Sequence, residues 1–459
     1  MLQSQVMAAK PQLFGTDGVR GVAGEYPLDP ATVWKLGRAI GTVLAKTPSS
    51  EAARVVLGED TRESSVWISR TLAAGLRSAG ATVTSAGVIT TPGVAFLTRH
   101  HGFSAGIVVS ASHNPYQDNG IKVLSSAGMK LSEARELAIE QELARTPPAK
   151  PQTSRRRLAQ APQLLRDYIT YLVGLITPSE RLSGLRLVVD CAHGASSRVV
   201  PDLLSRLGIE ARILNAAPNG RNINLECGSL HPERMAQETK QLGADLGVAF
   251  DGDADRAILA TREGRILDGD HVLYSCGLHL HRCRGLKGPC VVGTLMTNLG
   301  LELALARQGV ALKRTPVGDK YVLEEMLRSG LNLGGEPSGH IIFSDISLAG
   351  DGLITLLQVL RLLNDAGESL EDLVAGLQQF PQIIRNVRVC RKLPLDSIPQ
   401  VEEAIAKCRH EFGERGRVVV RYSGTEKVAR VMVEAEEAEA VHRHAARIAE
   451  AIEATLGTA

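Results

Sequence analysis

The chain has 459 residues, of which 44% are hydrophobic and 22% are charged, fractions that are usual for a soluble globular protein. One hydrophobic core seldom serves so long a chain, so we expect several domains. The 52 Lys and Arg residues nearly balance the 50 Asp and Glu residues, and this net charge of +2, with only 3% aromatic residues, argues against a dedicated nucleic-acid-binding protein.

Cysteine usage and hydropathy predict a soluble, cytoplasmic protein. The seven cysteines show no paired spacing, which favours a reducing compartment. Residues 1–10 lack the apolar stretch and the small-residue cleavage site of a secretory signal. No apolar run reaches the length that a bilayer span requires, so no membrane partner is expected.

Three stretches repeat one pattern, in which an apolar strand is followed by a helix-period segment, a glycine and a second strand. The copies span residues 55–83, 187–209 and 291–310. Each glycine stands where a left-handed cap ends a helix. Because strand–helix–strand units favour parallel strands covered on both faces, the pattern predicts three related α/β domains with mixed, mainly parallel sheets.

The rest of the chain supplies boundaries. Residues 146–157 contain three prolines and an arginine triplet without periodicity, which is typical of a linker with a solvated charge run. Beyond Gln382, short strands alternate with two helical stretches, so a smaller α+β domain is expected at the C-terminus. The predicted domains are residues 1–157, 158–262, 263–382 and 383–459.

The first chemical motif is a serine loop. Ser110, Ser112 and Pro115 follow the apolar strand 106–109. Ligands usually bind at the carboxyl end of a parallel strand, where either hydroxyl could act on one. The residue types do not distinguish Ser110 from Ser112, and by itself the segment also fits an ordinary polar turn.

The second motif places three carboxylates, those of Asp251, Asp253 and Asp255, directly after the strand 246–250. Alternate carboxylates repel one another unless a cation lies among them. Hard oxygen ligands select Mg²⁺ or Ca²⁺, and a site with few protein ligands suits Mg²⁺ with a phosphate. The alternative is a solvated acidic turn.

The third motif is a glycine-bounded loop at 335–340. Glu336 and Ser338 are suited to hydrogen bonding with sugar hydroxyls, and His340 could move a proton near neutral pH. A turn with a surface histidine is an equally good interpretation of this loop in isolation.

The fourth motif, near the C-terminus, has the components of a phosphate cradle. Hydroxyls, a glycine-exposed backbone and guanidinium groups can all bind phosphate. These residues are Arg421, Ser423, Gly424, Thr425 and Arg430. A hairpin with surface charges is the alternative. Taken together, however, the four loops are complementary, and each lies in a different predicted domain. They supply, in order, a nucleophile, a metal site, sugar ligands and a phosphate clamp.

In these motifs the chain resembles the α-D-phosphohexomutases over nearly its whole length. The resemblance also includes the segments at 14–21, 118–122 and 317–320. Several motifs in a fixed order are far more specific than any one of them. The resemblance implies a heart-shaped molecule of four domains with its active site in a central cleft.

The resemblance also implies roles for individual residues. Ser112, rather than Ser110, would carry the phosphate as a phosphoserine, and one Mg²⁺ would be held by the three aspartates and a phosphoserine oxygen. Arg20, Lys122 and His340 would surround the transferred group. The remaining substrate-binding positions would include Arg256, Gly318 and Asp319.

Within this family, the segments at 14–18, 218–224 and 423–426 favour glucosamine phosphate as the substrate, with glucose or mannose phosphates as the alternative. The expected reaction interconverts the 6- and 1-phosphates, on the route to UDP-N-acetylglucosamine and cell-wall precursors, and a hexose 1,6-bisphosphate is a possible activator. Pro337 and Lys427 depart from the usual pattern, which puts fine specificity in question. A monomer or a homodimer is expected.

Two other functions were weighed. Alternate aspartates also occur in haloacid-dehalogenase-type phosphatases, but there the first aspartate lies near the start of the chain. A non-catalytic sugar-phosphate sensor would have no use for the serine. Zinc ligation by Cys276, His279, His281 and Cys283 is disfavoured, because these residues fall in a helix-period stretch.

Overall fold

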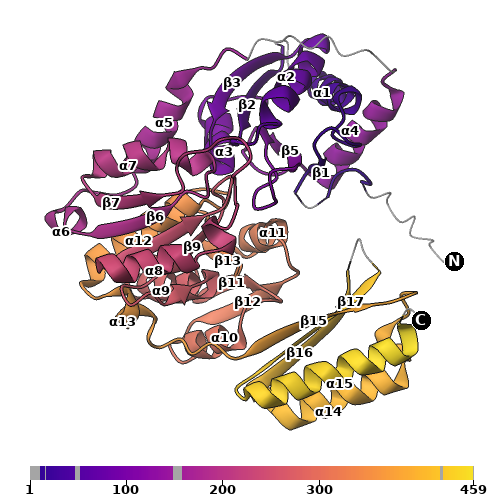
Figure 1. The fold of residues 1–459 in the computed structure, drawn as a ribbon, viewed down its shortest axis with the longest axis vertical. Coiled ribbons are helices and arrows are strands. Elements are labelled where there is room, and N and C mark those ends of the chain that lie inside the picture. Colours follow the sequence, from indigo (N-terminus) through magenta and orange to yellow (C-terminus); the bar gives the residue numbers. More distant parts are fainter. Residues whose placement is uncertain (1–10, 16, 47–51, 148–157, 424–426, 458–459) are drawn as a thin grey trace.

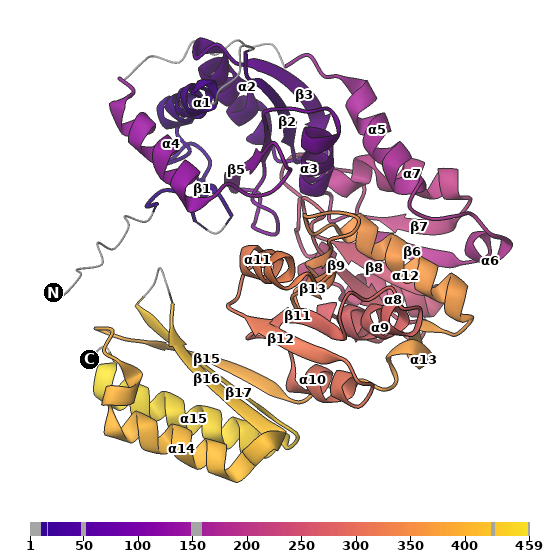
Figure 2. The same cartoon turned by 180° about the vertical axis from the view of Figure 1, so that it is seen from behind.

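The strands of the protein form four separate sheets that follow one another along the chain. The computed structural model describes residues 11–457 except residue 16 and residues 47–51, 148–157 and 424–426. Figure 1 shows the four units arranged around an arc, so that the last unit lies across from the first, and Figure 2 shows the same arrangement from behind.

The first unit is an α/β domain with a five-stranded sheet. In sheet order its strands are β1 (Val19–Val22), β5 (Asp118–Ser125), β4 (Ala105–Val109), β2 (Arg54–Glu59) and β3 (Thr82–Val88). Strand β2 runs parallel to β3 and β4, whereas β5 is antiparallel to its neighbours. Its helices are α1 (Pro30–Ala45), α2 (Ser65–Ser78), α3 (Thr91–His100) and α4 (Glu133–Arg145).

The second unit repeats this plan. In sheet order its strands are β10 (Ile266–Leu267), β9 (Ala257–Ala260), β8 (Leu246–Phe250), β6 (Arg186–Asp190) and β7 (Glu210–Leu214). Strand β6 is parallel to β7 and β8, and β9 is antiparallel to β8 and β10. Its helices are α5 (Pro162–Val173), α6 (Glu180–Ser183), α7 (Val200–Leu207) and α8 (Glu233–Leu242).

The third unit has a four-stranded sheet of the same kind. Its strands, in sheet order, are β12 (Ala311–Thr315), β11 (Cys290–Thr294), β13 (Leu333–Gly335) and β14 (Ile341–Phe343). Only the β13–β14 pair is antiparallel. The helices are α9 (Gly269–Arg282), α10 (Leu299–Ala306), α11 (Asp319–Ser329), α12 (Gly352–Ala366) and α13 (Leu370–Val374).

The fourth unit differs, as its composition predicted. Strands β15 (Gln382–Arg388), β17 (Val428–Ala435) and β16 (Gly416–Tyr422) form an antiparallel sheet, and helices α14 (Pro399–Phe412) and α15 (Ala438–Leu456) lie along one face of it (Figure 1). Fold class and architecture are therefore confirmed.

The three predicted strand–helix–strand repeats are the parallel pairs β2–β3, β6–β7 and β11–β12 with helices α2, α7 and α10 between their strands. Gly208 ends α7 in the left-handed conformation, with φ +68°. A residue with a Cβ would be sterically strained in this conformation, which explains why the repeat has a glycine at the end of its helix.

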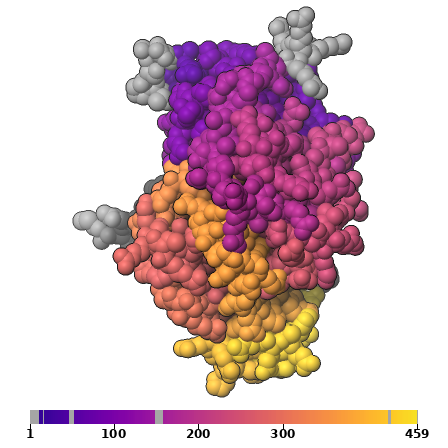
Figure 3. Space-filling view, turned by 90° about the vertical axis from the view of Figure 1, so that its left-hand side faces the viewer, coloured from indigo at the N-terminus to yellow at the C-terminus, as the bar shows by residue number. Residues whose placement is uncertain are grey.

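One apolar cluster runs through the first three units, the first unit has a further large cluster that includes Leu36 and Leu72, and the fourth unit has a core of its own. The first of these clusters includes Val56 of β2, Leu187 of β6 and Leu333 of β13. A separate cluster, with Val431 and Ile448 at its centre, fills the fourth unit. Figure 3 shows the fourth unit, in yellow, packing beneath the third.

Other expectations concern single segments. The helix over 269–282 is observed and contains Cys276, His279 and His281, and all seven cysteines of the chain are free. Most of the predicted linker, from residue 148 onward, lies outside the described residues. In the described part of the chain, no helix combines the length and apolar character that a membrane span needs.

Candidate active site

The serine loop leaves strand β4 and separates the two candidate hydroxyls. Ser110 Oγ is buried and donates a hydrogen bond to Asp60 Oδ2 at 2.7 Å. Ser112 has a left-handed backbone, with φ +52°, and its Oγ donates to Asp251 Oδ2 at 2.5 Å. Ser110 therefore supports the loop, whereas the hydroxyl of Ser112 points to the acidic loop of the second unit.

A buried arginine that the sequence analysis did not single out holds this loop. Arg62 is 1% exposed, and its guanidinium donates to the carbonyl oxygens of Ser112 (3.0 Å), Asn114 (2.8 Å) and Asp118 (3.0 Å), while Nε pairs with Asp60 at 2.8 Å. Asn224 Nδ2 adds a 2.8 Å hydrogen bond to the Ser112 carbonyl. Because a non-glycine residue at positive φ is strained, these bonds stabilise the conformation that exposes Ser112 to Asp251.

The acidic loop follows strand β8 and gathers all three predicted carboxylates. Asp251, Asp253 and Asp255 each offer an oxygen within 4.8 Å of the others. Gly252 makes the close approach to the serine loop possible, since a Cβ at that position would lie 2.6 Å from the Ser112 carbonyl oxygen. The solvated-turn alternative is wrong, because Asp251 and Asp253 are buried.

The surroundings shift the pKa values of Asp251 and Asp255 in opposite directions. Burial, together with the charges of Asp255 and Asp253, raises the pKa of Asp251 well above its ordinary value. Burial also opposes ionisation of Asp255, but the Lys122 ammonium and His340 outweigh it and hold the pKa of Asp255 well below the usual range. Lys122 Nζ lies 2.6 Å from Asp253 Oδ2 and 3.4 Å from Asp255 Oδ2. Buried carboxylates of this kind call for compensating positive charge.

The donor set fits a hard divalent cation. All three groups are carboxylates that converge from one loop, and the buried Asp253 Oδ1 has no hydrogen-bond partner among the residues that the structure describes. A buried acceptor without a donor is costly, and coordination to a metal would satisfy it. Oxygen ligands in a cluster of this size suit Mg²⁺.

The third loop lies beside these acids. His340 Nδ1 is 3.8 Å from Asp255 Oδ1, and its Nε2 is 3.5 Å from Asp319 Oδ2. Burial would lower the pKa of His340, but the hydrogen bond with Asp255 and the charges of Asp319 and Glu336 raise it to about 9. Glu336 Oε1 accepts from the Gly318 N–H at 2.9 Å, which ties together two of the predicted loops. These neighbours therefore favour the protonated form of His340.

Two arginines lie beside Ser112 and the three aspartates. Arg20, on β1, donates to Asp17 Oδ2 at 2.8 Å and to Asn114 Oδ1 at 3.3 Å, beside Ser112. The backbone N–H of Arg256 donates to Asp251 Oδ1 at 3.2 Å, and its guanidinium lies 3.9 Å from Asp255. The structure thus brings cations from two units around the serine and the acids.

The fourth loop lies on the hairpin of β16 and β17. Arg421 and Arg430 are directly paired across the two strands, and burial together with the charge of Arg430 lowers the pKa of Arg421. Two like charges side by side repel each other, and an anion between them would relieve this. The Ser423 N–H donates to Val428 O at 2.8 Å, whereas Gly424 and Thr425 lie outside the described residues.

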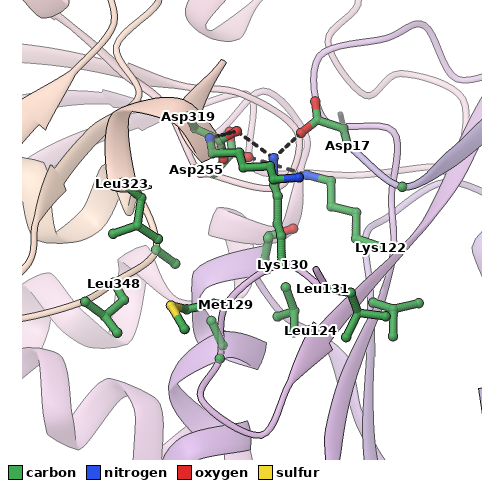
Figure 4. Close-up of a pocket in the computed structure, with 18 of the residues that line it drawn as sticks. Asp17, Lys122, Leu124, Met129, Lys130, Leu131, Asp255, Asp319, Leu323 and Leu348 are labelled. Atoms are coloured by element: carbon green, nitrogen blue, oxygen red, sulfur yellow. Dashed lines mark hydrogen bonds and ion pairs between the residues drawn. The ribbon is translucent and has the colours of Figure 1, made fainter. Parts of the chain in front are cut away.

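A cavity of about 250 Å³ opens where the first and third units meet beside the acids. Asp17, Lys122 and Asp255 lie at its polar end, and leucines such as Leu124, Leu131 and Leu323 line the rest (Figure 4). His340 also lines the cavity. None of the described residues that line it comes from the fourth unit. The predicted phosphate clamp therefore stands apart from this cavity.

Comparison with known families accounts for all four units. The models for domains I, II and III of phosphoglucomutase/phosphomannomutase match residues 11–149, 166–264 and 268–380, and the model for the C-terminal domain matches residues 385–451. The chain belongs to this family. It is therefore a phosphohexomutase, an isomerase that relocates a phosphoryl group on a sugar.

Curated relatives within the family share a name. The chain is 50% identical over 459 residues to a phosphoglucosamine mutase of Koribacter versatilis, with 97% of each chain covered. It is 48% identical to that of Solibacter usitatus, over 97% of this chain and 99% of the relative.

Solved structures agree on the fold. A phosphoglucomutase/phosphomannomutase family protein from Burkholderia thailandensis superimposes with a TM-score of 0.77 at 25% identity, covering 96% of this chain and 97% of the other. An N-acetylphosphoglucosamine mutase from Aspergillus fumigatus, solved with GlcNAc-6P and magnesium, gives a TM-score of 0.63 at 20% identity, over 89% of this chain and 84% of the other, and supports the fold alone.

Proposed function

We propose that this phosphohexomutase interconverts glucosamine 6-phosphate and glucosamine 1-phosphate, with phosphorylated Ser112 as the donor. The single observation that carries the proposal is the 2.5 Å contact between Ser112 Oγ and Asp251, inside a buried cluster of three carboxylates. The names of the curated relatives support glucosamine as the sugar. Phosphomannomutase or phosphoglucomutase activity is the alternative within the family.

The first transfer would move the phosphoryl group of Ser112 to the C1 hydroxyl of glucosamine 6-phosphate. The bond from phosphorus to Ser112 Oγ breaks, a bond to the sugar oxygen forms, and the product is the 1,6-bisphosphate. After the intermediate has turned over, its 6-phosphate returns to Ser112 and glucosamine 1-phosphate leaves. Free hexose 1,6-bisphosphate would therefore also activate a dephosphorylated enzyme.

Charge stabilisation is the main task of the residues around Ser112. A bound Mg²⁺, held by Asp251, Asp253 and Asp255, would supply electrostatic stabilisation of the transferred phosphoryl group. Arg20 would donate to its oxygens from the side of Asn114. Uncatalysed phosphate-ester chemistry requires up to ~10²¹-fold acceleration, of which proton transfer by one side chain supplies only about 10²–10⁴-fold, so positioning and charge must supply most of it.

Proton movement falls to the groups beside the acids. Asp255 and Asp319 raise the pKa of His340 to about 9, which favours its positively charged form. Its imidazolium would give a proton to the Ser112 oxygen as this oxygen leaves phosphorus, and the neutral imidazole would then take the proton of the C1 hydroxyl. The Lys122 ammonium holds the pKa of Asp255 low nearby. Glu336 and Ser338 would bind the sugar hydroxyls, with Arg256, Gly318 and Asp319 at the edge of the site.

The phosphate that does not react needs a separate site. Arg421 and Arg430, paired across β16 and β17, would bind it together with Ser423, Gly424 and Thr425. The same clamp would serve both orientations of the bisphosphate, because the two phosphates exchange places. We take the four domains to be residues 1–157, 158–262, 263–382 and 383–459, in a monomer or a homodimer. Closure of the last domain over the other three would exclude water from the phosphoserine.

Replacement of the proposed donor tests this function. Ser112→Ala should lose both the phosphorylated species in intact-mass analysis and mutase turnover of glucosamine 6-phosphate. Ser110→Ala is the matched control, since it alters the same loop but keeps the donor hydroxyl, and it should remain phosphorylated. Persistent turnover in Ser112→Ala would remove Ser112 from the mechanism.

The sugar is tested separately, by comparing the 6-phosphates of glucosamine, glucose and mannose at equal concentration. We expect the highest kcat/KM with glucosamine 6-phosphate. A preference for mannose or glucose 6-phosphate would favour the alternative within the family. Release of inorganic phosphate without isomerisation would instead indicate a hydrolase, and binding without turnover a sensor.

A further inference from the structure

Lys130 lies between two carboxylates that come from different units. Its Nζ donates to Asp17 Oδ1, just before β1, and to Asp319 Oδ1 at 2.6 Å, at the start of α11. Figure 4 shows the ammonium between the two carboxylates at the polar end of the cavity. The chemistry described above gives Lys130 no role, although its side chain is only 25% exposed.

Each of these carboxylates also contacts a residue of the reaction centre. Asp17 uses its other oxygen, Oδ2, to accept from Arg20 Nη2 at 2.8 Å. Asp319 likewise uses Oδ2, which lies 3.5 Å from His340 Nε2. Lys130 therefore stands at the midpoint of a chain of ion pairs that joins the arginine beside Ser112 to the histidine beside Asp255.

We propose that Lys130 is a positioning residue that sets Arg20 and His340 together, by pairing at once with Asp17 of the first unit and Asp319 of the third. The inference rests on the proposed function, because both residues are placed there around the transferred phosphoryl group. Lys130 would act through these two carboxylates.

Electrostatics explains why a cation is required at this point. Without Lys130, the carboxylates of Asp17 and Asp319 would face each other across the boundary between two units. Like charges in a partly buried site repel strongly, so the loops that carry them would separate. Arg20 and His340 would then shift in opposite directions, and a misplacement of about 1 Å can cost ~10²-fold in rate.

A second ion pair across the same boundary provides a matched control. Lys320 Nζ lies 3.4 Å from Glu133 Oε1, and it also joins the third unit to the first. The backbone N–H of Lys320 does donate to Asp319 Oδ1 at 2.8 Å, but a substitution of the Lys320 side chain leaves that bond in place. Lys320→Met therefore removes adhesion between the units without disturbing the chain of ion pairs through Lys130.

The kinetic test compares Lys130→Met with Lys320→Met in the full-length protein on glucosamine 6-phosphate. We expect Lys130→Met to lower kcat by roughly 10- to 100-fold with KM changed by less than about threefold, since transition-state groups are misplaced. Lys320→Met should stay within about twofold of wild type. Equal effects of the two variants, or a wild-type kcat in Lys130→Met, would overturn the inference.

A double-mutant cycle tests the route. If Lys130 acts through Asp319, adding Lys130→Met to Asp319→Asn should lower kcat by much less than Lys130→Met lowers it alone. Full additivity of the two changes would contradict this route. Partial recovery of kcat in Lys130→Arg, which keeps the charge, would support it, and a loss as large as that in Lys130→Met would oppose it.

Hydrogen exchange without substrate separates this inference from the proposed function. In Lys130→Met, amides at 317–320 and 128–132 should exchange faster than in wild type, while α14 and α15 keep their protection and show that the protein is folded. Unchanged exchange at both segments would overturn the inference even in an active enzyme. Failure of the wild type to isomerise any hexose phosphate would instead overturn the proposed function.

Discussion

At the scale of single residues, Arg62 shows how much a functional loop can depend on one buried side chain. Its guanidinium bonds the backbone of the serine loop and its Nε pairs with Asp60, and neither side chain is more than 1% exposed. Arg62 could have been found from the sequence, because it follows the predicted strand 55–57, at the same sheet edge as the serine loop.

We predict that Arg62→Met destabilises the protein and impairs catalysis. Removing one partner of a buried ion pair leaves the other charge uncompensated, which costs about 3–5 kcal/mol. Denaturant unfolding should show this loss, and kcat at a temperature where the variant is folded should also fall. An unfolding free energy within 1 kcal/mol of wild type would contradict the assigned role of Arg62 by the same estimate.

A second buried acid makes stability depend on pH. Asp351 caps α12 and accepts from Tyr168 Oη at 2.6 Å, and burial raises the pKa of its carboxyl from 3.8 to about 6. Because the raised pKa favours the protonated form in the folded state, Asp351 stabilises the fold most below pH 3.8, and this contribution is lost as the pH rises through 6.

The prediction concerns the difference between wild type and Asp351→Asn, which has no titrating group at this position. As the pH falls from 6 to 4, the unfolding free energy of wild type should rise relative to that of the variant. Urea unfolding at several pH values measures this difference. A constant difference over that range would show that the pKa of Asp351 is not raised in the folded state.

At the scale of elements, the active site is a meeting of strand-end loops. The sequence predicted the parallel units and their loops because apolar runs, helical periodicity and capping glycines are local signals. The antiparallel strands β5, β9 and β14 were not predicted, because their pairing depends on contacts distant in sequence. For the same reason the residue types did not distinguish Ser110 from Ser112, which the structure separates by their hydrogen bonds to Asp60 and to Asp251.

Glycine at position 252 is required by the distance between two loops. A Cβ there would lie 2.6 Å from the Ser112 carbonyl oxygen and 2.8 Å from Ile223 Cδ1. We therefore predict that Gly252→Ala lowers kcat by about 10²-fold, because the two loops must separate. Gly309→Ala is the control, since the structure leaves open space there, and it should keep full kcat at a small cost in stability because its φ is +75°. Equal kcat in the two variants would contradict the role of this contact.

At the scale of the whole molecule, one apolar cluster runs through the first three units, whereas the fourth unit has a separate core. The fourth remains attached through the buried Glu434, which accepts from the Leu299 N–H at the start of α10 and from Arg417 at 3.0 Å. This construction leaves the phosphate clamp on a separate body from the reaction centre. The sequence predicted the four bodies and their motifs, but not the attachment, since no local pattern marks Glu434.

The acidic cluster lies where the units meet, so we expect the activity of the whole molecule to depend on a divalent metal. Removing divalent metal with a chelator should abolish turnover, and Mg²⁺ should restore it, since three carboxylates converge and the buried Asp253 Oδ1 has no hydrogen-bond partner among the described residues. Unfolding should be compared in the same samples to show that the apo-protein is folded. Full turnover in excess chelator would exclude the metal from the reaction.

The central claim is that one hydroxyl, that of Ser112, gives a phosphoryl group to the sugar and takes one back. Its most direct test is to label the phosphoserine with ³²P, remove free label, and add unlabelled glucosamine 6-phosphate. We predict that the label leaves the protein and is recovered in hexosamine phosphates, including the 1,6-bisphosphate. Label that stays on the protein, or that appears only as inorganic phosphate, would contradict the claim.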